Sequence, residues 1–334
     1  SSSPAAETPT KYSRIHQSPQ ETPSPQETAS PQDTPSPQDT PSPQDTASPQ
    51  DTKPAQCQLV PYDTLLAPGG EVSYTVRLYN AAGDYLQEWE GAAANLRVQG
   101  SGSVANGTYT AAAGSQHEAA LVTCRIGNLT GTARVRVVPP LPWNFAFNNE
   151  EKVPLTWVGG RVRWVIRDLD GEMVAVKRSV LPTPRDPNNK LGTRSRMWMG
   201  PIDMSNYTIQ TDFALQKNAD TQKMSDLGLI NSRYTMTVRS SNKELRIYSW
   251  SPHDYRTYAS VPFDPEPGKW YTMKFEVSGS RIRGKLWERE AAEPEEWTVA
   301  MTDPAPNVSG SPGLYGNAQE AEIYIDNLSV VAND

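Results

Sequence analysis

A tandem repeat of six residues is the sequence feature that most restricts what this chain can fold into. Six copies of Ser-Pro-Gln-Asp/Glu-Thr, each followed by Pro, Ala or Lys, run from Ser18 to Lys53. No residue from His16 to Gln56 has a large apolar side chain, so the stretch has nothing with which to form a core. Proline fixes φ and removes a backbone donor, which excludes a helix or a central strand. We therefore expect an extended polyproline II rod at residues 18–53, after a disordered segment at residues 1–17.

The repeat places hydroxyl groups in regular rows along this rod. A polyproline II helix rises about 3.1 Å per residue, so each copy adds about 19 Å and presents its side chains in the same directions. Such rows on a proline-spaced rod resemble O-glycosylated, mucin-like stalks. An unmodified flexible spacer is the alternative, and identical copies also suit a self-assembling fibre core. The residues expected to carry sugars are Ser18, Thr22, Ser24, Thr28, Ser30, Thr34, Ser36, Thr40, Ser42, Thr46, Ser48 and Thr52.

Charge and segment composition exclude several function classes. The net charge of −7 argues against nucleic-acid binding, which requires a basic stripe. No apolar run approaches the length of a membrane span. The chain begins at Ser1 without Met, as a processed secreted protein would. We therefore expect an extracellular or cell-surface protein.

From Cys57 onward, short β-branched and aromatic runs alternate with turn residues, which favours antiparallel β-sandwiches. The first predicted module spans residues 57–138. Val72, Tyr74, Val76 and Leu78 alternate with polar residues, as in a half-buried strand. Further predicted strands bury two more sets of residues and expose two arginines. The buried sets are Ala120, Val122, Cys124 and Ile126, then Val135 and Val137, and the exposed residues are Arg134 and Arg136.

Three runs of this module carry a family resemblance. Residues 66–83 read L-A-P-G-G-E-V-S-Y-T-V-R-L-Y-N-A-A-G, residues 107–111 read G-T-Y-T-A, and residues 129–138 read L-T-G-T-A-R-V-R-V-V. In this order they resemble the bacterial immunoglobulin-like domains of cell-surface proteins. The resemblance implies a seven-stranded sandwich that acts as a spacer or adhesive unit without catalytic residues.

Both cysteines of the chain, Cys57 and Cys124, lie in this module. An exported chain meets oxidising conditions, which favours a disulfide between them. The chain-entropy model gives such a bond about 4 kcal/mol of stabilisation. Two buried free thiols are the alternative.

The stiff linker V-P-P-L-P, with its core at residues 139–142, precedes a second predicted module at residues 143–334. Tyr271, Met273, Phe275 and Val277 occupy one face of a predicted strand. The last strand shifts phase, which predicts a bulge at Asp326-Asn327. Several long alternating strands with few helices predict two stacked sheets, a jelly roll.

The end of this module also carries a resemblance. The runs at residues 267–287, 310–316 and 321–330 resemble laminin-G and concanavalin-like jelly rolls, which bacteria attach to carbohydrate-binding and sugar-hydrolysing proteins. The two modules in this order look like the C-terminal region of secreted β-propeller proteins of the pyrroloquinoline-quinone-like repeat class from planctomycete-type bacteria. No propeller blades are present here, so neither the cofactor nor the activity of that class is carried over.

We find no catalytic constellation in the sequence. Laminarinase-like relatives use E-x-D-x-x-E, and no such spacing occurs. The three histidines belong to three different regions, so neither a zinc cluster nor a Ser-His-Asp arrangement is suggested. We expect no enzyme activity and no cofactor, with calcium at Asp326 as a weak candidate. An aspartate that caps its own backbone is the alternative there.

The second module also offers a sugar-binding prediction. Aromatic faces stack on sugars, and cations on the same face suit acidic glycans. The possible glycan-binding residues are Trp250, Arg281, Arg283, Lys285 and Trp287. The alternative is that the tryptophans are rim and core residues.

The sequence thus predicts a non-enzymatic extracellular structural or adhesive protein. Its partners would be covalent or bound glycans, a surface or matrix polysaccharide, and further copies of the chain through the repeat. The alternative is a lectin-like subunit or a fragment of a polysaccharide-active enzyme.

Overall fold

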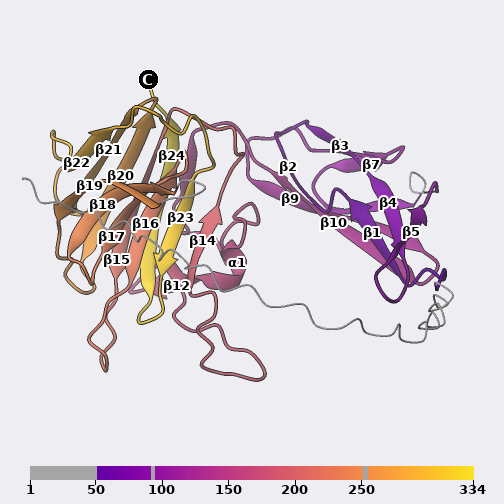
Figure 1. Cartoon of the computed structure of the whole chain (residues 1–334), viewed down its shortest axis with the longest axis horizontal. Coiled ribbons are helices and arrows are strands. Elements are labelled where there is room, and N and C mark those ends of the chain that lie inside the picture. The colour runs from indigo at the N-terminus through magenta and orange to yellow at the C-terminus, as the bar shows by residue number, and fades with distance from the viewer. Residues whose placement is uncertain (1–50, 92–94, 251–254) are drawn as a thin grey trace, which may run out of the picture. The chain divides into compact units, whose positions relative to one another are not determined.

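Short strands account for nearly all regular structure in the computed structural model, which describes residues 51–91, 95–250 and 255–334 (Figure 1). Buried apolar side chains form two clusters, one drawn from residues 59–137 and the other from residues 138–330. Each cluster belongs to its own set of sheets. The predicted all-β fold class, an immunoglobulin-like sandwich followed by a concanavalin-like jelly roll, is confirmed. Among the described residues, no helix is long and apolar enough to cross a membrane.

The first sandwich has short strands in three small sheets. Their orders are β1-β4-β5, β3-β8-β7 and β2-β10-β9-β6. β1 pairs with β4, whereas β2 runs parallel to β10, so the first segment contributes to both layers. The strands are β1 (Gln56–Val60), β2 (Asp63–Leu66), β3 (Glu71–Ser73), β4 (Thr75–Tyr79), β5 (Tyr85–Glu88), β6 (Leu96–Gly100), β7 (Ser103–Ala105), β8 (Thr108–Thr110), β9 (Glu118–Ile126) and β10 (Leu129–Val137).

The predicted strand around Val76 is divided between two sheets. Tyr74, Val76 and Leu78 are buried as expected. The strand divides at Tyr74 because β3 pairs with β8 and β4 pairs with β1. Alternation therefore identified the buried face, while the break depended on which strand each half meets.

One exposure prediction in this module is wrong. Arg134 is exposed, but Arg136 is buried. The guanidinium of Arg136 pairs with Asp63, and its Nε donates to the carbonyl oxygen of Leu155 at 3.1 Å. Leu155 belongs to the second module, so the arginine is covered by a segment that the strand's own pattern does not reveal.

The second module is a jelly roll of two stacked sheets. One has the order β12-β13-β24-β15-β20-β21-β22, with β11 beside β24, and the other has the order β14-β23-β16-β17-β18-β19 (Figure 1). The elements are β11 (Trp143–Phe145), α1 (Gly160–Arg163), β12 (Trp164–Leu169), β13 (Glu172–Lys177), β14 (Arg194–Trp198), β15 (Tyr207–Leu215), β16 (Asp226–Asn231), β17 (Tyr234–Arg239), β18 (Glu244–Trp250), β19 (Tyr255–Pro262), β20 (Trp270–Ser278), β21 (Arg281–Glu288), β22 (Val299–Thr302), β23 (Gly313–Asn317) and β24 (Ile323–Ala332).

The predicted core faces of the jelly roll are confirmed. The alternating apolar residues of β20 are buried, and so are those of β24 on both sides of its phase shift. The register between β15 and β24 slips between Gln210 and Asp212, which leaves Asn327 and Leu328 opposite Thr211. A bulge is therefore present one residue beyond the predicted Asp326-Asn327. Asn327 adopts φ 48°, and its side-chain amide donates to Asp212 at 2.9 Å.

The two modules contact each other through a histidine. His117 Nδ1 lies 2.9 Å from Thr156 Oγ1. Its ring packs edge-on against Trp143 with 5.0 Å between centroids, and against Phe145 at 5.1 Å. His117 comes from the first sandwich and the other three residues from the second, so the proline linker is supplemented by packed side chains.

Candidate functional site

The outer face of the six-stranded sheet of the jelly roll carries a row of polar and aromatic side chains. Core-facing residues of this sheet, such as Met197, Leu314 and Met236, are buried in the jelly-roll core. Successive side chains of a strand point to opposite faces, so the residues between them point outward. The register places Arg196 beside Tyr315, Gly228 between Tyr315 and Thr237, and Arg246 beside Thr237.

A groove of about 440 Å³ runs along this face. We call it the outer-face groove and define it by four arginines and two tyrosines, Arg194, Arg196, Arg239, Arg246, Tyr248 and Tyr315. Gly228 lies against Thr237, where an added Cβ would lie 2.6 Å from Thr237 Oγ1 and 3.0 Å from the carbonyl oxygen of Met236. Glycine therefore lets Thr237 pack closely against β16.

The tyrosine rings hold the arginines in place. The Arg196 guanidinium lies 5.4 Å from the ring centroid of Tyr315, and Arg194 Nε donates to the Tyr315 hydroxyl at 3.1 Å. On the other side, the Arg246 guanidinium lies 4.7 Å from the ring of Tyr248. Cation–π contacts of this kind restrict a long side chain without neutralising its charge. The arginines are thus positioned as well as charged.

Positive charge is crowded in the groove. Asp226 is the one acid among its lining residues. Glu244 pairs with Arg239 at 3.2 Å and with Arg246 at 3.9 Å. Burial, followed by the charge of Arg239, lowers the pKa of Arg246. In the described part of the chain, no carboxylate forms an ion pair with Arg194 or Arg196.

A buried hydroxyl group faces the groove without a hydrogen-bond partner. Thr237 is 1% exposed, and within the described residues its Oγ1 makes no hydrogen bond. A buried unsatisfied hydroxyl destabilises a fold by about 1–3 kcal/mol. Thr237 is also one of the residues that line the groove.

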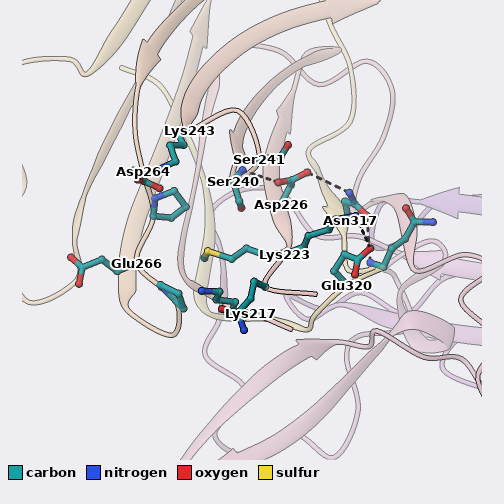
Figure 2. A pocket seen from close by; sticks show the side chains of 15 residues that line it. Lys217, Lys223, Asp226, Ser240, Ser241, Lys243, Asp264, Glu266, Asn317 and Glu320 are labelled. Atoms are coloured by element: carbon teal, nitrogen blue, oxygen red, sulfur yellow. Dashed lines mark hydrogen bonds and ion pairs between the residues drawn. The ribbon is translucent and has the colours of Figure 1, made fainter. Parts of the chain in front are cut away.

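The groove continues into a second pocket at the ends of the strands (Figure 2). This loop pocket, of about 720 Å³, includes Lys217, Lys223, Lys243, Asp264, Glu266 and Glu320. Asp226, Ser241 and Asn317 line both spaces. Figure 2 shows Asp226 accepting hydrogen bonds from the Ser240 amide at 2.8 Å and from Asn317 Nδ2 at 3.4 Å. The two spaces therefore adjoin along one edge of the sheet.

The loop pocket differs from the groove in its charge balance. Lys243 pairs with Asp264 at 2.7 Å, and Lys223 lies 3.9 Å from Glu320. Two of the three lysines that line it therefore have acidic partners. The outer-face groove instead has two guanidinium groups, those of Arg194 and Arg196, without an acidic partner among the described residues.

The predicted glycan-binding stripe on β21 has the expected alternation but is covered. Arg283 pairs with Glu276 at 2.8 Å, and its guanidinium lies 4.1 Å from the ring of Trp297. Lys285 is buried and donates to Glu293 at 2.8 Å and to the carbonyl oxygen of Pro294 at 2.7 Å. Glu276 on β20, together with Glu293 and Trp297 from the segment between β21 and β22, thus occupies these cations.

The remaining members of that prediction are scattered. Arg281 is exposed and lies 3.8 Å from Glu276, and Trp287 is half-buried. Trp250 ends β18, and its side chain is outside the described part of the structure. The stripe stays a prediction, and the groove on the opposite sheet is the more open surface.

The other sequence-based site predictions have mixed outcomes. Cys57 and Cys124 are free thiols in this structure, so the predicted disulfide is not formed in it. Asp326 accepts a hydrogen bond from the Asn327 amide at 2.8 Å, as a backbone cap does. The described residues hold no group of three His, Cys, Asp or Glu side chains suited to a metal ion. Of the predicted glycosylation residues, Thr52 is exposed and the others lie outside the described residues.

Sequence reasoning missed the outer-face groove. Its arginines and tyrosines come from β14, β17, β18 and β23, which are far apart in the chain. Arg-Ser-Arg at residues 194–196 and Arg-Ile-Tyr at residues 246–248 are local signals, because each places two such side chains on one strand face. The sheet order β14-β23-β16-β17-β18 brings the two signals together.

Comparisons with known proteins return solved structures but no sequence relative. No family model matches the chain, and no curated protein matches it. A carbohydrate-binding module from Bacillus subtilis is 15% identical, with 51% of this chain and 93% of that one covered and a TM-score of 0.37. A xylan β-1,4-xylosidase from Bacillus halodurans is 12% identical, with 78% and 60% covered and a TM-score of 0.40, so this chain spans 60% of its length. A galectin from Caenorhabditis elegans is 10% identical, with 41% and 90% covered and a TM-score of 0.30.

Proposed function

We propose that the jelly roll binds a carbohydrate chain along the outer-face groove and thereby attaches the protein to an extracellular polysaccharide. The observation that carries this proposal is an open groove that combines positioned guanidinium donors, two tyrosine rings and the unpaired Thr237 hydroxyl. Sugars offer hydroxyl groups that accept such hydrogen bonds and C–H faces that pack on aromatic rings. The adjoining loop pocket supplies room for a chain of several sugars.

The character of the lining favours a sugar over an apolar small molecule. Pockets for apolar ligands are lined mainly by hydrophobic side chains. This groove is lined mainly by Arg, Ser, Thr, Asn and Asp. Its polar character and its extension across several strands therefore suit an oligosaccharide.

We also propose that binding occurs without hydrolysis of the chain. Glycoside hydrolysis usually uses two carboxyl groups that flank the scissile bond. Among the residues lining the groove, Asp226 is the one carboxylate, and both of its oxygens accept hydrogen bonds. In this proposal the first sandwich and the repeat hold the binding module away from its anchoring point.

The test is a glycan array probed with the full chain and with Thr237→Val. Valine has the shape of threonine without the hydroxyl group, and it removes an unsatisfied buried oxygen, so the melting temperature should stay equal or rise. We expect specific glycan binding by the wild type and affinity about 3- to 10-fold weaker in the variant, because one hydrogen bond is lost. An array without any bound glycan, or release of reducing ends from a bound polysaccharide, would contradict the proposal.

A further inference from the structure

We propose that the ligand of the outer-face groove is an anionic sugar chain, with carboxylate or sulfate groups, and that Arg194 and Arg196 bind its anions. This inference rests on the proposed carbohydrate-binding function and adds the class of sugar. It starts from the contrast between the groove and the rest of the protein. The whole chain has a net charge of −7, whereas the groove lining has four arginines and one acid.

The two outer faces of the jelly roll provide an internal comparison. On β21, the cations Arg283 and Lys285 are paired with Glu276 and Glu293. The positive charge of these two β21 side chains is therefore neutralised by neighbouring acids. On β14, in the described part of the chain, Arg194 and Arg196 have tyrosine contacts but no carboxylate partner. The groove thus keeps the positive charge that the opposite face neutralises.

The spacing of these two arginines suits an extended anionic chain. Residues i and i+2 of a strand point to the same face, with about 6.6–6.8 Å between them. The Arg194 and Arg196 side chains therefore lie next to each other along the edge of the groove. A guanidinium presents two parallel N–H donors, which match the two oxygens of a carboxylate or of a sulfate group.

The floor of the groove completes the case for an oxygen-rich ligand. The Thr237 hydroxyl is a donor without a protein acceptor among the described residues. Gly228 on the neighbouring strand lets Thr237 pack closely, because a Cβ at Gly228 would lie 2.6 Å from Thr237 Oγ1. Arg239 and Arg246 share the carboxylate of Glu244, and burial, followed by the charge of Arg239, lowers the pKa of Arg246. An anion in the groove relieves that repulsion.

The experiment measures binding of the full chain to three soluble probes by affinity electrophoresis and by titration at low and high salt. The probes are polygalacturonate for carboxylates, chondroitin sulfate for sulfate groups, and neutral xylan. We expect binding to at least one anionic probe, weakening as salt rises, because exposed charge interactions are screened. Which anionic probe binds more tightly separates the carboxylate source from the sulfate source.

Variants locate the binding within the groove. Arg194→Gln and Arg196→Gln should each weaken anionic binding about 10- to 100-fold, because a hydrogen bond to a charged group is lost. Arg196→Lys keeps the charge but loses the paired donors, so it should recover only part of the affinity. The matched control is Arg125→Gln, which removes the same charge from an exposed residue of the first sandwich and should leave affinity unchanged. Melting temperatures of all variants exclude misfolding.

Three results would overturn the proposal in different ways. Binding of neutral xylan alone, weakened by Thr237→Val, would reject the anionic ligand and leave the carbohydrate-binding function standing. Equal loss of anionic binding in Arg125→Gln and in the groove variants would show nonspecific attraction to net charge. Absence of binding to any carbohydrate would reject both the anionic ligand and the function on which it rests.

Discussion

Burial lowers the pKa of His117 to about 4, since the ring lies between the two modules. Unfolded histidine has a pKa of about 6.5, so the folded protein binds this proton less tightly than the unfolded chain. The contribution of His117 to the free energy of unfolding is therefore complete above pH 6.5. It falls as the pH drops to about 4, by at most about 3 kcal/mol.

The test at His117 is the variant His117→Phe, which keeps an aromatic ring against Trp143 and removes the titrating group. The free energy of unfolding should fall less steeply between pH 6.5 and 4 in the variant than in the wild type. Chemical denaturation at a series of pH values measures this difference. Parallel pH profiles for the two proteins would show that His117 is not the acid-sensitive residue.

The titration of Asp326 changes the free energy of unfolding in the opposite direction to that of His117. Burial, together with the nearby charge of Asp212, raises the pKa of its carboxyl group to about 6. The unfolded value is about 3.9, so the folded protein binds this proton more tightly than the unfolded chain does. The contribution of Asp326 therefore lowers stability above pH 6, and this loss is relieved as the pH falls to about 4.

We predict that Asp326→Asn raises the free energy of unfolding at pH 7.5 by about 1–3 kcal/mol and has little effect at pH 4. Asparagine keeps an acceptor for the Asn327 amide. The exposed Asp264→Asn serves as control, because a surface ion pair contributes about 0–1 kcal/mol. The same melts with calcium added test the calcium prediction: a calcium-dependent rise in the wild type that is absent from Asp326→Asn would support a site there.

At the scale of elements, the two cysteines belong to strands of different sheets. Cys57 lies on β1, and its Sγ would be 3.2 Å from a Cβ placed on Gly131. Gly131 on β10 is paired in register with Cys124 on β9. Burial, followed by the charge of Cys57, raises the pKa of Cys124. The two thiols thus face the same part of the first core.

We predict that oxidising conditions join Cys57 to Cys124, with about 4 kcal/mol of stabilisation. Peptide mass spectrometry without reduction should detect the linked pair. Reduction should then lower the melting temperature of the first sandwich only, because the jelly roll has no cysteine. Free thiols at both positions after air oxidation would reject the bond.

The strands also show which structural features residue alternation predicts and which it does not. Alternation identified the buried faces of β9, β20 and β24, because a strand with one face in a core must have an apolar side chain at every second residue. It also identified the shared face of Arg283 and Lys285. It did not reveal that Glu276 and Glu293 pair with them, or that Leu155 covers Arg136. Those contacts join segments whose separation along the chain leaves no local pattern.

At the scale of the whole molecule, the repeat makes a prediction about the mass of the protein. If the repeat is a glycosylated stalk, the intact mass of the protein from its native source should exceed the 36.8 kDa of the polypeptide. Deglycosylation should return the mass to that value, and the same chain made in bacteria that lack O-glycosylation is the control. A native mass equal to the polypeptide mass would leave the repeat as a bare spacer.

The sequence by itself determined the fold class, the two β modules and the faces of their main strands, because burial forces a local periodicity that can be read from one segment at a time. It also determined that the repeat cannot form a core, since it has no large apolar side chains. Only the tertiary structure decided which cationic surface is open. Arg283 and Lys285 are neighbours on one strand, yet acids from other segments neutralise them. Arg196 and Arg246 lie on β14 and β18, and the sheet order of the jelly roll places them along one groove.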